Sequence, residues 1–247
     1  MPENAHIIAV IPARFASTRF PGKMLADLAG EPLVLRTWRN TLLCKTVERV
    51  IVATDDERIA SIIHEAGGEA VMTDPELPSG TDRINQAISE LEADIVVNVQ
   101  GDEPMLPAEL VDNTVALLLN NPEADAATAA TPLRVEEYTD PNVVKITCTE
   151  QNKALYFSRA PIPYSRDSEM PEDLALRHIG LYVYRRNTLT RFCSLPPSPL
   201  EECERLEQLR LLEDGGTMLV HIAQNAGPGG IDTPTDLERV RQVLTTP

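Results

Sequence analysis

The sequence predicts an α/β fold in which a mostly parallel sheet is covered by helices. Apolar, β-branched runs of strand length alternate with segments whose apolar residues recur at helical spacing. Acidic residues and glycine pairs separate these runs, as in "TDDER" (54–58) and "EAGGEA" (65–70). A βαβα order of this kind makes successive strands parallel and puts helices on both faces of the sheet. The 247 residues are enough to bury a substantial core.

The first hundred residues contain the clearest strands. Each expected strand is a short apolar run that ends in polar or turn-forming residues, and the run at 94–104 is the most apolar. The expected strands lie in "HIIAVIP" (6–12), "VERVIVATDD" (47–56), "EAVMT" (69–73) and "DIVVNVQGDEP" (94–104). Helices are expected in "ERIASIIHEAGG" (57–68), which Gly67 and Gly68 end, and in "TDRINQAISELEA" (81–93).

The pattern loosens after about residue 130. "YFSRAPIPYSRD" (156–167) is too rich in proline for a central strand, whereas "HIGLYVYRR" (178–186) alternates like an antiparallel or edge strand. We expect residues 130–190 to form a smaller subdomain that is inserted into a single domain of residues 1–247.

Two helices are expected near the C-terminus, and each begins with a capping residue followed by proline. Ser198 precedes Pro199, and Glu201 completes a capping box; Gly215 and Gly216 end this helix. Thr233 and Pro234 repeat the arrangement for "DTPTDLERVRQVL" (232–244).

The net charge of -16 and a pI near 4.6 argue against a nucleic-acid or membrane-surface partner. No apolar run is long enough to span a membrane, and the N-terminus does not resemble a signal peptide. The four cysteines lie far apart without C-x-x-C spacing, which is typical of free thiols in the reducing cytosol. We therefore expect a cytoplasmic protein.

One loop departs from this acidic character. "IPARFASTRFPGK" (11–23) places Arg14, Arg19 and Lys23 directly after the first strand, with Ser17 and Thr18 as hydroxyl donors. Ligands bind at the carboxyl ends of strands in open α/β sheets, and arginine and lysine match phosphate oxygens. The P-loop and G-x-G-x-x-G patterns are both absent, which argues against a dinucleotide-dependent oxidoreductase. The loop predicts a phosphate site; the alternative is a solvated surface loop.

Two further turns follow strands or precede helices. Asp102 comes just after the most apolar strand, where a carboxylate can hold Mg²⁺ against a nucleotide or simply cap the next helix; the sequence leaves both open. "PSGTDR" (78–83) places Ser79 at a helix start whose free N–H groups could face an anion or a base, although on its own this signal is weak.

Three polar residues of the second half are also candidates. Glu207 shares a helical stripe with the apolar Leu200, Cys203 and Leu211, so its carboxylate needs a partner or reaches to water. His178 and Tyr182 are four residues apart in a strand and should lie on one face; a lone histidine in such a place is more often structural.

Taken together, the motifs resemble the 3-deoxy-manno-octulosonate (Kdo) cytidylyltransferase family, also known as CMP-Kdo synthetases. The resemblance runs in order from about residue 6 to 244. The motifs that carry it are "IPARFASTRFPGK", "VATDDERI", "PSGTDR", "VNVQGDEP", "ALYFSRAPIPY", "RHIGLYVYR", "PSPLEECERLEQLR" and "GIDTPTDLERV".

This resemblance implies a nucleotide-diphospho-sugar transferase (Rossmann-like) fold and a homodimer. It further implies that CTP and Mg²⁺ activate Kdo for lipopolysaccharide biosynthesis, with release of pyrophosphate. The anomeric hydroxyl of the sugar would attack the α-phosphate of CTP.

The resemblance also implies roles for individual residues. Lys23 and Arg14 would hold the triphosphate, with Arg19 assisting. Gln100, Arg83 and Ser79 would surround the cytosine and ribose. Asp102 and Asp232 would hold Mg²⁺, and together with Lys23 and Arg14 they are the expected catalytic residues. The sugar pocket would be formed by Arg159 at the carboxylate, by Glu207 and Gln208 at the hydroxyls, and by His178 and Tyr182.

Two rival functions stay open at this stage. A cytidylyltransferase for sialic acid or another 2-keto acid sugar needs the same nucleotide site, and "SRAPIPY" and "RHIGLYVY" favour Kdo over it. A non-catalytic nucleotide-binding regulator belongs to a different class. The presence of Lys23, Asp102 and Asp232 argues against it, because a protein that only binds nucleotide has no need for a second Mg²⁺, held by these aspartates in addition to one that neutralises the triphosphate.

Overall fold

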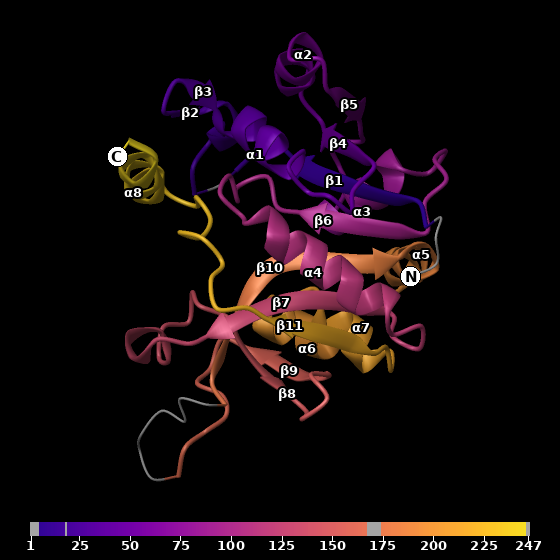
Figure 1. Ribbon diagram of the computed structural model, residues 1–247, viewed down its shortest axis with the longest axis vertical. Coiled ribbons are helices and arrows are strands. Elements are labelled where there is room, and N and C mark those ends of the chain that lie inside the picture. Colours follow the sequence, from indigo (N-terminus) through magenta and orange to yellow (C-terminus); the bar gives the residue numbers. More distant parts are fainter. Residues whose placement is uncertain (1–4, 18, 167–173, 246–247) are drawn as a thin grey trace. The chain divides into compact units, whose positions relative to one another are not determined.

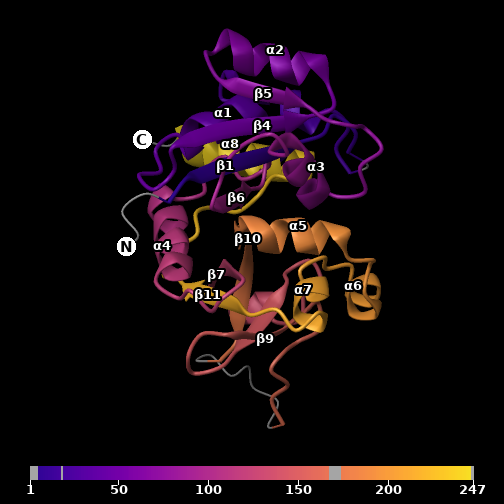
Figure 2. The same ribbon diagram turned by 90° about the vertical axis from the view of Figure 1, so that its right-hand side faces the viewer.

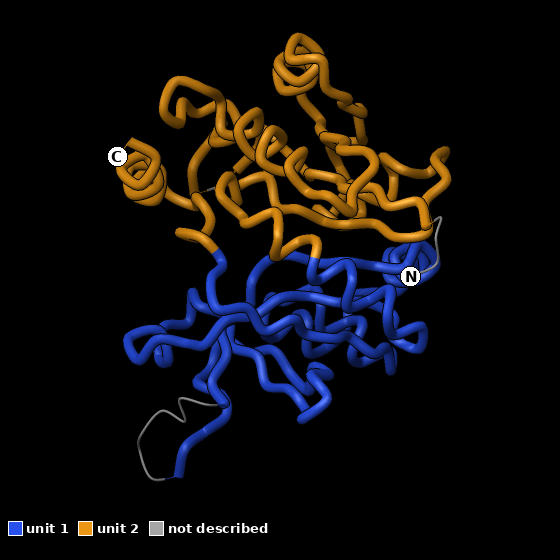
Figure 3. The backbone as a smooth tube through the Cα atoms, viewed as in Figure 1, with its two compact units in different colours: residues 1–2, 113–226 blue, residues 3–112, 227–247 orange. Residues whose placement is uncertain are grey.

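The structure, a computed structural model, describes residues 5–17, 19–166 and 174–245. The chain forms two compact units, which Figure 3 colours blue and orange. The first comprises residues 1–2 and 113–226, and the second comprises residues 3–112 and 227–247. None of the helices in the described ranges combines the length and apolar character that crossing a bilayer requires.

The second unit is built on a parallel sheet with the strand order β6-β1-β4-β5 (Figure 1). Residues 9–11 of the central strand β1 are completely buried, as expected for a strand covered on both faces. The strands are β1 (Ile7–Ala13), β4 (Arg49–Thr54), β5 (Glu69–Met72) and β6 (Ile95–Val99).

Helices flank this sheet (Figure 2). Helix α1 packs on β1 and β4, α2 on β4 and β5, and α3 on β1 and β4. Helix α8 returns from the C-terminal segment and packs beside a small hairpin, where Leu28, Leu33, Ile231, Leu237 and Val240 form one apolar cluster. The elements are α1 (Leu33–Thr41), α2 (Glu57–Glu65), α3 (Gly80–Ala87), α8 (Pro234–Thr245) and the hairpin strands β2 (Asp27–Leu28) and β3 (Glu31–Pro32).

The first unit contains the strand order β11-β7-β10, with β8 pairing with β10 and with β9. β10 runs antiparallel to β7, and β11 runs parallel to it. The strands are β7 (Ala126–Pro132), β8 (Lys145–Cys148), β9 (Ala154–Ser158), β10 (Leu176–Arg185) and β11 (Met218–Ile222). The helices are α5 (Arg186–Ser194), α6 (Pro199–Glu204) and α7 (Leu209–Glu213), while α4 (Ala108–Leu119) carries the chain between the units.

The predicted fold class is confirmed, and so are the strands expected in the first hundred residues. The capping box of Ser198 and Glu201 and the antiparallel character of β10 are also as expected. No disulfide joins any of the four cysteines, which all lie in the described ranges. The helix expected over residues 81–93 is shorter and ends at Ala87. The expected subdomain of residues 130–190 lies within the first unit, which extends beyond it at both ends.

Candidate active site

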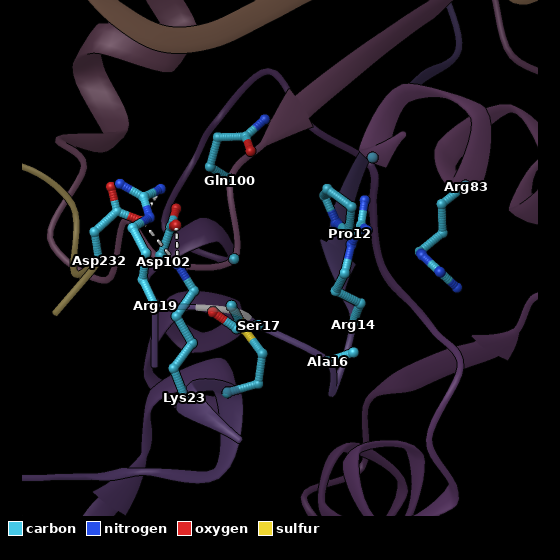
Figure 4. A pocket seen from close by; sticks show the side chains of 13 residues that line it. Pro12, Arg14, Ala16, Ser17, Arg19, Lys23, Arg83, Gln100, Asp102 and Asp232 are labelled. Carbon is cyan, nitrogen blue, oxygen red and sulfur yellow. Dashed lines mark hydrogen bonds and ion pairs between the residues drawn. The ribbon is translucent and has the colours of Figure 1, made fainter. Parts of the chain in front are cut away.

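A cleft of about 300 Å³ lies in the second unit, at the carboxyl ends of β1 and β6. Figure 4 shows Lys23, Arg19, Asp102 and Asp232 grouped at one side of it, and Arg14 and Arg83 at the other. The described lining residues are Pro12, Arg14, Ala16, Ser17, Arg19, Lys23, Met24, Gly80, Arg83, Gln100, Gly101, Asp102 and Asp232. Thr18 lies outside the described residues.

The side chain of Lys23 is buried and points at two carboxylates. Gly22, at φ 70°, turns the chain into a short 3₁₀ helix that begins at Lys23. The ammonium Nζ donates to Asp102 Oδ2 at 2.5 Å, to Asp232 Oδ1 at 3.2 Å and to the carbonyl of Ile231 at 3.1 Å. A single ammonium therefore joins the two aspartates that were expected to bind the metal.

Asp232 reaches the cleft although 130 residues separate it from Asp102. The loop before it turns at Gly227, φ 76°, where an added Cβ would lie 2.6 Å from the carbonyl oxygen of Met105. The backbone N–H of Ile231 then donates to the carbonyl of Asp102 at 2.9 Å, which fixes the two segments side by side. Arg19 Nη2 also donates to Asp232 Oδ1, at 2.9 Å.

Arg14 and Arg83 supply positive charge to the other side of the cleft. Arg83 is 1% exposed and donates to Thr73 Oγ1 and, at 3.2 Å, to Asp55 Oδ2. Burial lowers the pKa of Arg83, Asp55 opposes this shift, and the charge of Arg14 adds to it. Arg14 itself is exposed and has no ion pair among the described residues, so its guanidinium is available to an anion.

Gln100 and Ser79, which were expected near the base and ribose, both form hydrogen bonds with neighbouring side chains. Gln100 lines the cleft, and its Nε2 donates to Asn98 Oδ1 at 2.8 Å. Ser79 is the N-cap of α3: its hydroxyl accepts from the N–H of Asp82 and donates to the Asp82 carboxylate. The neighbouring Gly80, rather than Ser79, lines the cleft. The capping role of Ser79 is thus visible, and a role toward nucleotide stays a prediction.

The carboxylates of Asp102 and Asp232 suit a divalent cation whose other ligands are phosphate oxygens. No cluster of three or more histidine, cysteine or acidic side chains suited to a metal occurs in the described ranges. Mg²⁺, however, usually takes one or two carboxylates and completes its shell with phosphate oxygens and water. The ammonium of Lys23 already acts as a cation between Asp102 and Asp232. The donor set is therefore appropriate for Mg²⁺ in the presence of a nucleotide.

The expected sugar residues all belong to the first unit, and two of them are neighbours on β10. The rings of His178 and Tyr182 have centroids 5.4 Å apart, and Phe157 meets His178 edge-on at 5.0 Å. His178 Nε2 lies 2.9 Å from Thr128 Oγ1, which itself donates to the carbonyl of Leu181. Because that hydroxyl proton is committed, Nε2 carries the histidine proton and Nδ1 is left as an acceptor.

Glu207 and Gln208 occupy the turn between α6 and α7, so the predicted apolar stripe is wrong. The chain leaves the helix at Arg205, which has the left-handed φ of 55°, and resumes at Leu209. Glu207 consequently does not share a helix face with Leu200 and Leu211. Glu207 and Gln208 are instead neighbours at one turn, where their placement does not depend on an amphipathic helix.

Buried polar atoms gather around this turn and β10. The Nε2 of Gln208 and the hydroxyl of Tyr184 are buried and accept or donate no hydrogen bond among the described residues. Tyr184 stacks on Tyr182 at 5.9 Å, and burial together with the charge of Glu207 raises the pKa of both phenols. Buried polar groups of this kind are expensive without a partner, which points to a polar ligand.

Arg159 follows β9 and is held by backbone carbonyls. Its Nε donates to the carbonyl of Glu204 and its Nη1 to that of Pro141, each at 2.9 Å. The side chain thus has a fixed orientation while its charge is not paired with a carboxylate among the described residues.

Sequence reasoning missed several residues that support these sites. Asp55 accepts from Arg83 and from the N–H of Phe15, so it ties the cationic loop to the end of β4; its position after a strand was the available signal. Tyr184 was also missed, although it alternates with Tyr182 in the same strand. Glu204 could not have been found, because its partner Arg159 lies 45 residues away.

The whole chain is similar to known cytidylyltransferases. The sequence pattern of the family described as "Cytidylyltransferase" matches residues 8–222. The 3-deoxy-manno-octulosonate cytidylyltransferase of Bdellovibrio bacteriovorus is 46% identical, with 97% of this chain and 98% of the relative covered; that of Geobacter sulfurreducens is 43% identical, with 97% and 99% covered. A solved structure of CMP:2-keto-3-deoxy-manno-octonic acid synthetase complexed with CTP superposes with a TM-score of 0.92 at 39% identity, over 97% of this chain and 98% of that one.

Proposed function

Because the chain belongs to the cytidylyltransferase family and is a nucleotidyltransferase, we propose that it transfers the cytidylyl group of CTP to Kdo and releases pyrophosphate. The observation that carries this proposal is the cleft after β1, which combines three cations of one loop with two carboxylates from distant segments. The relatives at 43–46% identity are named for the same reaction.

In the second unit, the nucleotide would enter with its triphosphate toward the cationic loop. Arg14 offers a free guanidinium, and Lys23 and Arg19 lie at the side of the aspartates. Nucleotidyl transfer depends mainly on positioning and on stabilising charge at the phosphates, which these side chains can do. Gln100 would read the cytosine by hydrogen bonds, and Arg83 and Ser79 would contribute to the base and ribose site.

Asp102 and Asp232 would hold Mg²⁺. When bound, the metal neutralises phosphate charge and lowers the pKa of the attacking hydroxyl. The protein's own contribution is to bring these two carboxylates together, through the backbone hydrogen bond between Ile231 and Asp102.

In the first unit, the buried polar atoms without a hydrogen-bond partner among the described residues suit the hydroxyl-rich sugar. His178 Nδ1 can accept from a hydroxyl, and Gln208 Nε2 can donate to one. Tyr182 and Glu207 would complete the pocket. Arg159 would bind the carboxylate, which a 2-keto acid sugar carries and an ordinary hexose lacks.

The wider setting is part of the same proposal. The product would serve lipopolysaccharide biosynthesis in the cytoplasm, and the enzyme would act as a homodimer on small-molecule substrates without nucleic-acid or membrane partners.

Pyrophosphate release from purified protein, CTP, Mg²⁺ and one sugar at a time tests the proposal. Kdo should support turnover, whereas sialic acid should give less than about a hundredth of that rate, since a pocket built on hydrogen bonds rejects a mismatched ligand strongly. UTP in place of CTP is the matched nucleotide control. Faster turnover with sialic acid would reassign the substrate, and CTP binding without any turnover would favour a regulator.

A further inference from the structure

Lys145, at the start of β8, is a charged side chain with no exposed surface. Its ammonium donates to three backbone carbonyls, those of Asp140 and Val143 at 2.7 Å each and that of Arg159 at 2.6 Å. An ammonium has three protons, so all its donors are satisfied without a carboxylate. Such an arrangement offsets the cost of burying the charge and fixes three points of the backbone around one atom.

The segments that Lys145 joins are the ones that orient Arg159. Pro141 lies between two of the residues that the ammonium holds, and its carbonyl accepts from Arg159 Nη1 at 2.9 Å. On the other side, Glu204 accepts from the N–H of Arg159 through its carboxylate and from Nε through its carbonyl. Among the described residues, no acceptor faces Arg159 Nη2. The Nη1–Nη2 edge of the guanidinium is therefore the part left for a ligand.

Two cations and two carboxylates lie in this part of the first unit. Burial lowers the pKa of Lys145, Asp140 opposes this shift, Arg159 adds to it, and Glu204 opposes it more weakly. Neither cation has an ion pair with a described residue. The side-chain hydrogen bonds of both cations go to neutral carbonyls, so the guanidinium of Arg159 keeps unused donors for a charge-assisted bond to an anionic ligand.

We propose that Lys145 is a positioning residue for the carboxylate of the sugar substrate: it holds the 140–143 turn and residue 159 so that Arg159 presents a fixed Nη1–Nη2 edge, and it adds its charge behind that edge. This rests on the proposed function, in which Arg159 binds the carboxylate of Kdo. Lys145 itself does not touch the substrate.

The direct test is Lys145→Met, which keeps the length of the side chain and removes its charge and donors. The KM for Kdo should rise by at least about tenfold, while the KM for CTP stays within about twofold. Lys153→Met, at an exposed lysine of the same unit, is the matched control and should change neither value. A purely structural role would raise both KM values together or only reduce the active fraction, and either result would overturn the assignment.

A double-mutant cycle with Arg159→Ala separates the roles. If Lys145 acts through Arg159, the double variant should have the same KM for Kdo as Arg159→Ala alone, within about twofold. If the fold-increases in the KM for Kdo of the two single variants multiply in the double variant, Lys145 acts independently of Arg159 and the positioning role is overturned.

The single variants also separate this proposal from the proposed function. If Arg159→Ala leaves the KM for Kdo unchanged, Arg159 does not bind the carboxylate, and the role of Lys145 is overturned with that assignment. If Arg159→Ala raises that KM and Lys145→Met does not, only the role of Lys145 falls.

Folding of the variants is checked by circular dichroism and thermal melting. Should Lys145→Met not fold, Lys145→Arg carries the same test, because it keeps the charge but cannot place three donors on the same three carbonyls. The KM for Kdo should then still rise, and an unchanged value in the folded variant would overturn the proposal.

Discussion

At the scale of single residues, the ammonium of Lys23 lies where a divalent cation would have to bind. Lys23 and Arg19 together balance the charge of Asp102 and Asp232, and they use oxygens that a metal would need. Binding of the proposed Mg²⁺ would therefore displace the ammonium of Lys23, unless a triphosphate gave that ammonium another anion to bind. By linkage, nucleotide and metal should each strengthen the binding of the other.

Lys23→Met should reveal this competition. Without nucleotide, the variant should bind Mn²⁺ about tenfold more tightly than the parent protein, because the carboxylates lose their internal counter-ion. Electron paramagnetic resonance of free Mn²⁺ measures this directly, with Lys45→Met, at an exposed lysine of the same unit, as the control. Unchanged or weaker binding in the Lys23 variant would show that Lys23 does not compete.

Asp232→Asn should nearly abolish turnover while leaving the fold intact, and it should raise the Mg²⁺ requirement. Alternatively, Asp232 is only an acidic residue at the start of α8, where its interaction with the helix dipole stabilises the fold by less than about 1 kcal/mol. That capping role already belongs to Thr233 and Asp236, which hydrogen-bond each other's backbone N–H at 2.9 and 3.2 Å.

The matched control for Asp232 is Asp236→Asn. Losing part of the cap should lower the free energy of unfolding by about 1 kcal/mol and spare the chemistry. Near-normal turnover of a folded Asp232→Asn protein would contradict the metal role; both variants are compared by urea unfolding and pyrophosphate release.

The protonation of His178 should contribute to the change of the free energy of unfolding with pH. Burial lowers its pKa to about 3, below the value of about 6.5 expected in the unfolded chain. Between these two pH values only the unfolded state takes up the proton. The contribution of His178 to the free energy of unfolding is therefore complete above pH 6.5 and is lost as the pH is lowered toward 3.

Comparison of His178→Gln with the parent protein isolates this contribution. The loss per pH unit should become shallower by up to about 1.4 kcal/mol in that window. Burial also lowers the pKa of His221, whose contribution persists in both proteins. His64→Gln, at an exposed helix residue, should leave the slope unchanged. Equal slopes in the parent and His178→Gln proteins, from urea midpoints at several pH values, would rule the effect out.

At the scale of elements, the clearest difference from the sequence prediction is the break between α6 and α7. Every local signal in "EECERLEQLRLL" (201–212) favours one helix. In the structure, Arg210 forms a two-pronged salt bridge with Glu201, at 2.7 and 2.5 Å. Nine residues of continuous helix would separate them by about 13.5 Å, so this pair requires the break. Local sequence patterns extend over three or four residues, so they could not predict a salt bridge between residues nine positions apart.

Arg205→Gly tests the strain at that break. Glycine adopts the left-handed conformation without the penalty of a Cβ, so the variant should be more stable by about 0.5–1 kcal/mol, with unchanged activity. Arg205→Ala is the matched control, because alanine keeps the Cβ and should bring no such gain. Thermal or urea unfolding measures both, and a destabilised glycine variant would mean that the exposed Arg205 side chain contributes more than the strain costs.

The parallel sheet, by contrast, followed directly from the sequence. Its strands are short buried runs that end in polar residues, and the polar ends of β1 and β6 carry the cleft. Local patterns therefore located Arg14, Lys23 and Asp102. They could not reveal that Asp232 meets Asp102, since that depends on the return of a distant segment; there the family resemblance supplied the expectation.

At the scale of the whole molecule, the residues proposed for the two substrates belong to different units. Those for CTP lie within residues 3–112 and 227–247, and those for Kdo lie within residues 113–226. The hydrogen bonds described above for the proposed CTP residues lie within the second unit, and those for the proposed Kdo residues lie within the first, so a change confined to one pocket should affect one substrate.

Glu207→Ala should accordingly raise the KM for Kdo at least about tenfold and change that for CTP by less than about twofold. Steady-state kinetics with each substrate varied in turn gives both values. Glu202→Ala, at an exposed position on α6, serves as the control. Equal effects on the two substrates would assign Glu207 a structural role.

The discontinuity of the second unit also has a consequence for how the protein is made. Its strands and cationic loop are synthesised first, yet Asp232 and the apolar residues of α8 that pack on Leu28 and Leu33 come more than a hundred residues later. While the ribosome is still adding the intervening unit, Lys23 has only one of its two carboxylates. The nascent chain thus carries the loop of the proposed nucleotide site without the second carboxylate of the proposed metal site, and we expect turnover only after residues 232–240 have been translated and the returning helix has docked.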